Sequence, residues 1–203
     1  MLNEHKSFFR SIKRLLILLS SWKFYMKSSG QHGNQNTIRI FKEVNDFKAV
    51  EKLLRGSGIE IPEKYKERIA EGDKFVCTLD AHQKVFSYGW STRRSVMPLS
   101  EVGLLFRNDN STVLYDFYTP AIHRRQGQYT SLLQYIGTTH SDQQYWIYAH
   151  KNNPASWRAI ERAGFQRQSL ARLILQNKFC ELVHDHNETK EEFEQSPYPC
   201  HSF

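Results

Sequence analysis

The sequence has few cysteines, and they form no recognisable pattern. Only three are present among 203 residues, Cys77, Cys180 and Cys200, and no two of them make a C-x-x-C pair. This odd, widely spaced set provides neither a disulfide framework nor a zinc motif. His184 and His186 lie close together near the end of the chain, but no third ligand stands at a fixed spacing. We therefore expect no metal and a cytoplasmic protein.

A long uninterrupted apolar run is also missing. The stretch FFRSIKRLLILLSSWKFYMK at residues 8–27 is unbroken only at Leu15–Leu19, and no small-residue cleavage site follows it. A membrane-spanning helix needs about 20 apolar residues, and a signal peptide needs that cleavage site. Apolar residues recur every three or four positions, which predicts a basic amphipathic helix. It could lie on the inner face of the membrane, pack on its own domain or join two chains in a homodimer.

Signatures of nucleic-acid binding are missing too, although the net charge is +7. No helix–turn–helix, RNP or zinc-knuckle pattern is present, so we expect no nucleic-acid partner. We predict three parts: a basic helix and linker at 1–36, a folded domain at 37–178 and an acidic, disordered tail at 179–203. The basic character of the domain favours an anionic ligand such as a phosphorylated cofactor.

The central segment does contain alternating strand and helix patterns. Strands are expected where β-branched and aromatic residues are dense, at 37–44, 74–80, 84–90, 111–119, 144–150 and 165–176. Helices are expected where a capping residue precedes an amphipathic pattern, at 45–56, 61–72, 129–140 and 154–164. This order predicts an α/β fold with a mixed sheet covered by helices. The segment 92–110 is expected to be a loop.

The stretch HRRQGQYTSLL at residues 123–133 joins one of these strands to a helix. Free backbone amides and the positive end of the helix dipole meet at such a junction and bind anions. Gly127 lets the backbone approach an anion, and Arg124 and Arg125 add positive charge. Alone, this is a weak signal. It gains specificity because NPASWRAIERAGF follows at 153–165, after the next strand.

Together the two stretches resemble the GNAT acyltransferase superfamily, in which a strand, a (Q/R)-x-x-G-x-(G/A) loop and a helix precede a strand and an N-x-x-(A/S) helix ending in GF. The resemblance covers about residues 37–178, and the matching residues are Arg124, Gly127, Asn153, Ser156, Gly164 and Phe165. It implies a GNAT-like fold and acetyl-CoA as cofactor. LYDFYTPAIHRRQGQYTSLL, behind a basic N-terminus, is also similar to GNAT proteins of bacterial polysaccharide and lipopolysaccharide gene clusters.

The resemblance also implies which residues bind coenzyme A. The pantetheine arm would lie between two splayed strands, on the backbone of Phe117, Tyr118 and Thr119. Beside Arg124, the pyrophosphate would be held by the amides of Arg125, Gln126, Gly127, Gln128, Tyr129 and Thr130. Asn153 and Ser156 would line the groove. Two residues depart from the pattern: Tyr129 stands where the family usually has glycine or alanine, and Ile160 stands where a tyrosine often protonates the departing thiolate.

Candidate catalytic groups lie near the ends of the strands that flank the loop. Asp116, inside VLYDFY, would be costly to bury unpaired, and His150 belongs to the residue type that most often acts as a general base, so both are candidate general bases. A structural ion pair for Asp116 and a structural role for His150 are the alternatives. In place of Ile160, the candidate acids are the tyrosines Tyr118, Tyr148 and Tyr129.

We therefore expect an N-acetyltransferase that moves an acetyl group from acetyl-CoA directly to a primary amine. The cysteines lie outside the motifs, which argues against an acyl-enzyme. The acceptor, which the sequence of 92–110 does not reveal, could be an amino sugar, free or sugar- or lipid-linked, in cell-surface polysaccharide synthesis. The alternatives are a protein or small-molecule amine, and a non-catalytic module that binds CoA. The expected location is the cytoplasm, with peripheral membrane contact through 8–27.

Overall fold

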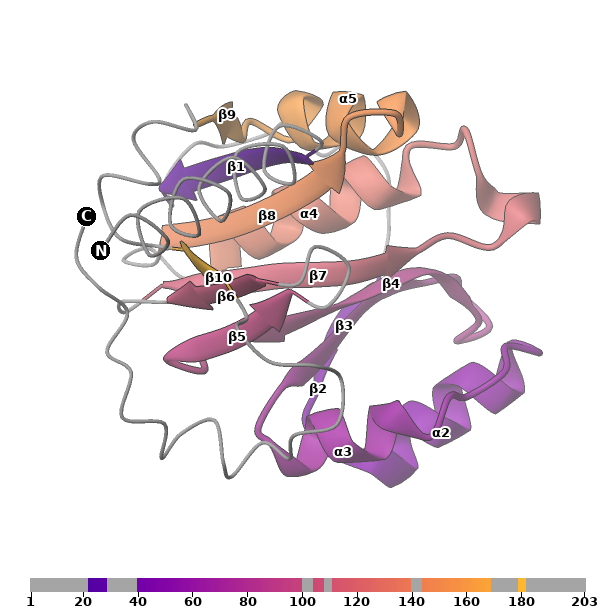
Figure 1. The fold of residues 1–203 in the computed structure, drawn as a ribbon. Helices are drawn as coiled ribbons and strands as arrows, with labels where there is room; N and C mark the ends of the chain where they lie inside the picture. The colour runs from indigo at the N-terminus through magenta and orange to yellow at the C-terminus, as the bar shows by residue number, and fades with distance from the viewer. Residues whose placement is uncertain are drawn as a thin grey trace, which may run out of the picture.

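The architecture is a seven-stranded mixed sheet with helices on both faces, and a small second sheet lies beside it (Figure 1). The computed structural model describes residues 22–28, 40–99, 104–107, 111–139, 144–168 and 179–181. In spatial order, the main sheet consists of β2 (Ile40–Val44), β3 (Lys74–Leu79), β4 (Val85–Thr92), β7 (Thr112–Tyr118), β8 (Gln144–His150), β1 (Trp22–Ser28) and β9 (Gln166–Arg167). Adjacent strands of this sheet are antiparallel, except that β7 and β8 are parallel.

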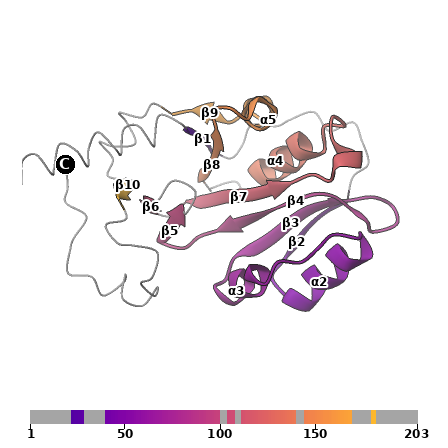
Figure 2. The ribbon, with the colours of Figure 1, turned by 45° about the vertical axis from the view of Figure 1, so that its right-hand side comes forward.

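The helices divide between the two faces of this sheet (Figure 2). One face carries α2 (Phe47–Gly56) and α3 (Lys64–Ala70), and the other carries α4 (Gln128–Thr139) and α5 (Pro154–Arg162). A short 3-10 helix, η1 (Ala121–His123), lies between β7 and α4. Capping residues explain two of the starts, because Asp46 accepts from the amide of Ala49 at 2.9 Å and Asn153 accepts from the amide of Ser156 at 3.2 Å.

A hydrophobic core lies on each face, and successive residues of the strands alternate between them. In β1, Phe24 packs in the core between the sheet and helices α2 and α3, whereas Tyr25 packs in the core between the sheet and helices α4 and α5. The hydroxyl of Tyr25 donates to Glu161 at 3.0 Å. Both faces of the central strands are therefore buried, and their sequences lack a polar side.

The predicted mixed α/β architecture is confirmed, and so are most of its elements. Strand β8 has the predicted limits, and each of the four predicted helices is present within two or three residues at either end. The strands predicted at 74–80 and 84–90 are β3 and β4, which pair antiparallel as a hairpin.

The prediction of an N-terminal helix at 8–27 is wrong for the C-terminal end of that range. Residues Trp22–Ser28 form β1, which pairs with β8 along its whole length and with β9 on its other edge. The segment before residue 37 therefore contributes a strand to the core sheet. The rest of the predicted helix, at 8–21, and the linker at 29–36 lie outside the described residues.

Three further expectations need correction. The segment 92–110 contains β5 (Val96–Leu99) and β6 (Leu104–Arg107), which pair with each other. The start of the expected tail forms β10 (Phe179–Glu181), which pairs with β6 and completes the small sheet. The last expected strand, 165–176, is a strand only at β9, and 169–176 lie outside the described residues. In the described part of the chain, no helix is long and apolar enough to cross a bilayer.

Candidate functional site

Strand β7 changes direction at a β-bulge just before the loop. Tyr115 pairs with Trp90 and Tyr118 pairs with Tyr88, so Asp116 and Phe117 together face Gly89. Asp116 has φ +49°, in the left-handed region that aspartate tolerates better than most residues. Gly89 makes the bulge possible, because a Cβ there would lie 2.6 Å from Cγ of Phe117 and closer still to two other ring atoms.

Beyond this bulge, β7 and β8 separate. Their parallel ladder joins residues 112–114 to residues 145–147 and then stops, although both strands continue (Figure 1). The predicted splay is therefore present, and an extended ligand could lie between the diverging ends as a partial extra strand.

The loop after β7 presents backbone amides at the wide end of the splay. Arg125 has φ +61° and Gly127 has φ +72°, and the amide of Ser131 donates to the Gly127 carbonyl at 3.0 Å. The amides of the first turn of α4 precede this bond and have no acceptor inside the helix. Nε of Arg124 donates to the Thr119 carbonyl at 3.0 Å, which fixes the start of the loop.

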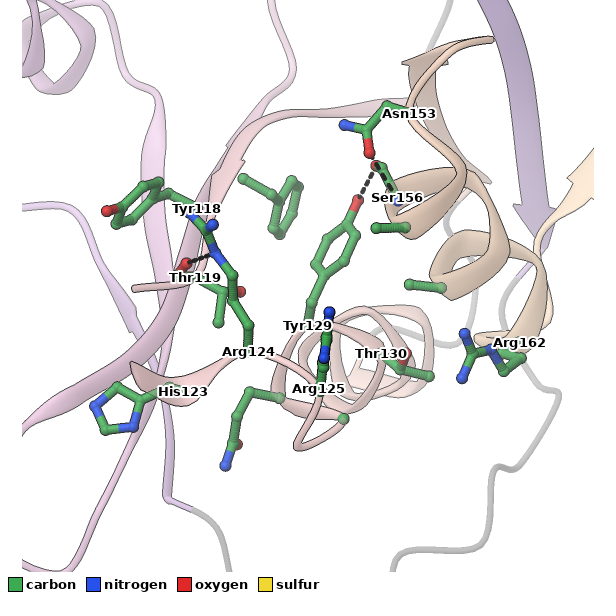
Figure 3. A pocket seen from close by; sticks show the side chains of 15 residues that line it. Tyr118, Thr119, His123, Arg124, Arg125, Tyr129, Thr130, Asn153, Ser156 and Arg162 are labelled. Atoms are coloured by element: carbon green, nitrogen blue, oxygen red, sulfur yellow. Dashed lines mark hydrogen bonds between the residues drawn. The ribbon is translucent and has the colours of Figure 1, made fainter. Parts of the chain in front are cut away.

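A cleft of about 660 Å³ lies between this loop, β7 and α5 (Figure 3). It collects eleven of the twelve predicted cofactor-binding residues: Phe117, Tyr118, Thr119, Arg124, Arg125, Gly127, Gln128, Tyr129, Thr130, Asn153 and Ser156. Gln126 does not line it and donates instead to the Ile122 carbonyl at 3.0 Å. The lining residues that the sequence did not reveal are His123, Ala155, Ala159 and Arg162.

The lining of the cleft is cationic. It includes Arg124, Arg125 and Arg162 and no carboxylate, and none of the three is ion-paired with an acidic residue of the described ranges. Guanidinium groups bind phosphates through paired donors. Oε1 of Gln128 is buried without a hydrogen-bond partner among the described residues, so a bound donor could satisfy it.

Tyr129 lies across the middle of the cleft (Figure 3). Its hydroxyl is 3.4 Å from Oγ of Ser156 on α5, and its ring centroid is 5.3 Å from that of Phe117 on β7. Burial raises the pKa of Tyr129, so its phenol remains neutral.

The candidate bases do not line the cleft. Asp116 forms ion pairs with Arg68 at 2.7 Å and with Lys64 at 3.6 Å on the α3 side of the sheet. His150 accepts from the Asn152 amide at Nδ1, at 3.2 Å, in the turn that follows β8. These ion pairs support the alternative role for Asp116, a structural ion pair in place of a general base.

Two of the three candidate acids line the cleft, and the third packs against a core. Tyr118 lines the cleft and is 43% exposed. Tyr129 also lines it, whereas Tyr148 packs against the core on the α2 and α3 side, with its ring 6.0 Å from that of Phe24. Ile160 is fully buried in the other core and presents no polar atom at that position.

The residues of the cleft fit coenzyme A at one end and obstruct it at the other. Amides, three arginines and the left-handed glycine suit a pyrophosphate. The tyrosine ring, in contrast, occupies part of the space between β7 and α5 that an extended arm would need. No three histidine, cysteine, aspartate or glutamate side chains in the described ranges are grouped as metal ligands would be.

Comparison with known proteins gives similarities to solved structures alone. No family model and no curated protein sequence matches the chain. Among solved structures, a GNAT-family acetyltransferase from Colwellia psychrerythraea aligns with TM-score 0.47 and 15% identity, over 72% of this chain and 52% of that one. A conserved protein of unknown function from Staphylococcus epidermidis gives 0.44 and 9%, over 72% and 57%. An aminoglycoside 6′-N-acetyltransferase from Acinetobacter baumannii gives 0.42 and 12%, over 64% and 91%.

The structural neighbours thus include GNAT acetyltransferases at low identity. The chain spans about half the length of the Colwellia protein. All three TM-scores are below 0.5.

Proposed function

We propose that this chain is an acyl-CoA-dependent N-acyltransferase that moves an acetyl group directly to a primary amine. The observation that carries the proposal is the cleft, where a left-handed glycine, the free amides of α4 and three arginines meet at the mouth of two diverging strands. This combination suits a ligand with a pyrophosphate and an extended arm, as coenzyme A has.

Specific residues would hold each part of that cofactor. The amides of residues 127–130, with Arg124 and Arg125, would bind the pyrophosphate, and Arg162 would add charge on the α5 side. The diverging end of β7 at Phe117 and Tyr118 would bind the arm. When bound, the cofactor would supply the acetyl group as a thioester.

The chain's own groups would manage protons during transfer. The attacking amine must lose a proton. Asp116 and His150 are the candidate acceptors, and because neither lines the cleft, the proton would reach either one through an intervening water or substrate group. Release of the thiolate needs a proton in return, and the phenols that line the cleft, Tyr118 and Tyr129, are placed to give one. Cys77 is buried in the core, which supports direct transfer without an acyl-cysteine.

A non-catalytic CoA-binding module is the second candidate. The ion pairs of Asp116 with Arg68 and Lys64 occupy the proposed base, and Ile160 removes the family's usual acid. An assay that separates binding from turnover is therefore needed.

The deciding experiment compares two glutamate substitutions at left-handed glycines. Gly127→Glu places a negative side chain in the anion site, whereas Gly58→Glu makes the same change at φ +68°, where nothing lies within 4 Å. By calorimetry, Gly127→Glu should weaken CoA binding by well over tenfold, about 1.4 kcal/mol or more, and Gly58→Glu should not. Equal affinity in wild type and both folded variants would reject the site.

Turnover is measured separately, as thiol release from acetyl-CoA in the presence of amines. The panel begins with amino sugars, the acceptor expected from the sequence, and includes a lysine peptide and a polyamine. CoA binding without transfer to any of these amines would favour the non-catalytic module.

A further inference from the structure

The side chain of Tyr129 contacts both walls of the cleft. It projects from the first turn of α4, and its ring packs against Phe117 on β7 while its hydroxyl lies within hydrogen-bond distance of Ser156 on α5 (Figure 3). These partners are 12 residues before it and 27 residues after it in the chain. A single side chain therefore bridges the space between the two elements.

The residues around this bridge are small. Gly127 precedes it by two positions, and Ala155 and Ala159 line the same cleft on α5. Among these small residues, the ring of Tyr129 is a steric obstacle. The resemblance to GNAT proteins makes the contrast sharper, because glycine or alanine is usual at the position of Tyr129.

The obstacle lies beyond the anion site and leaves that site open. Arg124, Arg125 and Gly127 are exposed, whereas Tyr129 is only partly exposed. A pyrophosphate could reach the loop without moving the ring. An arm that continues from it along the diverging end of β7 would meet the ring where the ring packs against Phe117, between β7 and α5.

We propose that Tyr129 is a gate across the cleft, which rests on the proposed binding of coenzyme A. With the Tyr129–Ser156 contact formed, the cleft accepts the pyrophosphate portion of the ligand. Entry of the pantetheine arm requires the ring to leave Ser156 and Phe117. The apparent affinity for the whole ligand is then reduced by the fraction of molecules in which the gate is open.

Two ligands and four proteins test the gate by calorimetry. ADP carries a pyrophosphate without the arm, and coenzyme A carries both. Tyr129→Ala should raise the affinity for coenzyme A at least fivefold and leave the affinity for ADP within twofold of wild type. Tyr129→Phe and Ser156→Ala each remove one hydroxyl oxygen and keep the carbon atoms of the side chain. Only the Tyr129–Ser156 contact is lost, so each should raise the affinity for coenzyme A by a smaller factor.

Association kinetics give a second readout. In wild type the observed rate of coenzyme A binding should level off at high concentration, because gate opening becomes limiting, and in Tyr129→Ala it should rise linearly. Unchanged or lower coenzyme A affinity in folded Tyr129→Ala would overturn the gate and make the ring a binding surface. Failure of wild type and every variant to bind either ligand would instead refute the proposed function.

Discussion

Gly89→Ala tests whether the bulge in β7 is built as the structure indicates. Gly89 faces both bulge residues, and an added Cβ would lie 2.6 Å from Cγ of Phe117 and nearer to Cδ1 and Cε1. Real Cβ atoms do not approach so closely, so the ring must move. Because Cγ lies on the axis about which the Phe117 ring rotates, rotating the ring does not move Cγ away from the added Cβ.

The size of the effect follows from two opposing terms. Overpacking of this kind costs about 1–3 kcal/mol in the folded state. Replacing glycine by alanine also restricts the unfolded chain, which returns about 0.4–1 kcal/mol. We expect Gly89→Ala to lower the free energy of unfolding by about 1–2 kcal/mol in urea titrations. Since the Phe117 ring lines the cleft, coenzyme A affinity should fall as well.

Two comparisons isolate the cause. Gly56→Ala makes the same change at the end of α2, where nothing lies within 4 Å, and should leave stability unchanged or raise it by up to about 1 kcal/mol. In a Phe117→Leu background the smaller side chain can withdraw, so Gly89→Ala should cost much less there than in wild type. An equal cost in both backgrounds would refute the contact as the source of the effect.

The remaining predictions concern the N-terminal strand, alkaline pH and the candidate bases. Removing residues 1–34 deletes β1 and its buried Tyr25, so cooperative unfolding in urea should be lost. Removing only the residues before β1 should preserve CoA binding and abolish any liposome sedimentation or dimerisation. Burial raises the pKa of Tyr145 to about 12 from 10.0, so its contribution to stability is complete below pH 10 and is lost as pH rises toward 12. Unfolding free energies measured from pH 8 to 11 should therefore decline above pH 10, by about 1.4 kcal/mol per pH unit for each tyrosine whose pKa burial raises. A flat profile would contradict this prediction. Asp116→Asn or His150→Gln should reduce kcat by roughly 10²-fold, and full activity in both would leave the proton to water or substrate.

Local signals made the helices and several strands predictable. Asp46 and Asn153 are side chains that favour helix starts, and in the structure each accepts a bond from an amide three residues later. The loop with Gly127 was predictable because a left-handed backbone next to a helix start favours glycine. These features depend on residues that are neighbours in sequence, and the chain shows them without tertiary information.

Strand β1 was not predictable in the same way. It lies between β8 and β9, so Phe24 and Tyr25 are both buried although they point to opposite faces. A strand buried on both faces loses the alternation that identifies strands. Its apolar residues instead continued the helical spacing of the preceding segment. Pairing with β8, which joins Ser28 to Gln144 and Trp22 to His150, decides its conformation, and these partners are more than 100 residues away.

The cleft shows the same division between local and distant causes. The anion site depends on backbone amides and on a glycine, which a short motif specifies. Access to the space beyond depends on where the ring of Tyr129 points, and that direction is set by Phe117 and Ser156, which approach only through the packing of β7 and α5 against α4. Gly127 in the loop and Tyr129 in the first turn of α4 are two residues apart but differ in kind, because the glycine exposes backbone and the tyrosine places a ring across the cleft. We therefore expect binding of a pyrophosphate and admission of an acyl-bearing arm to be separable in this chain, so that a substitution at Tyr129 changes the second without changing the first.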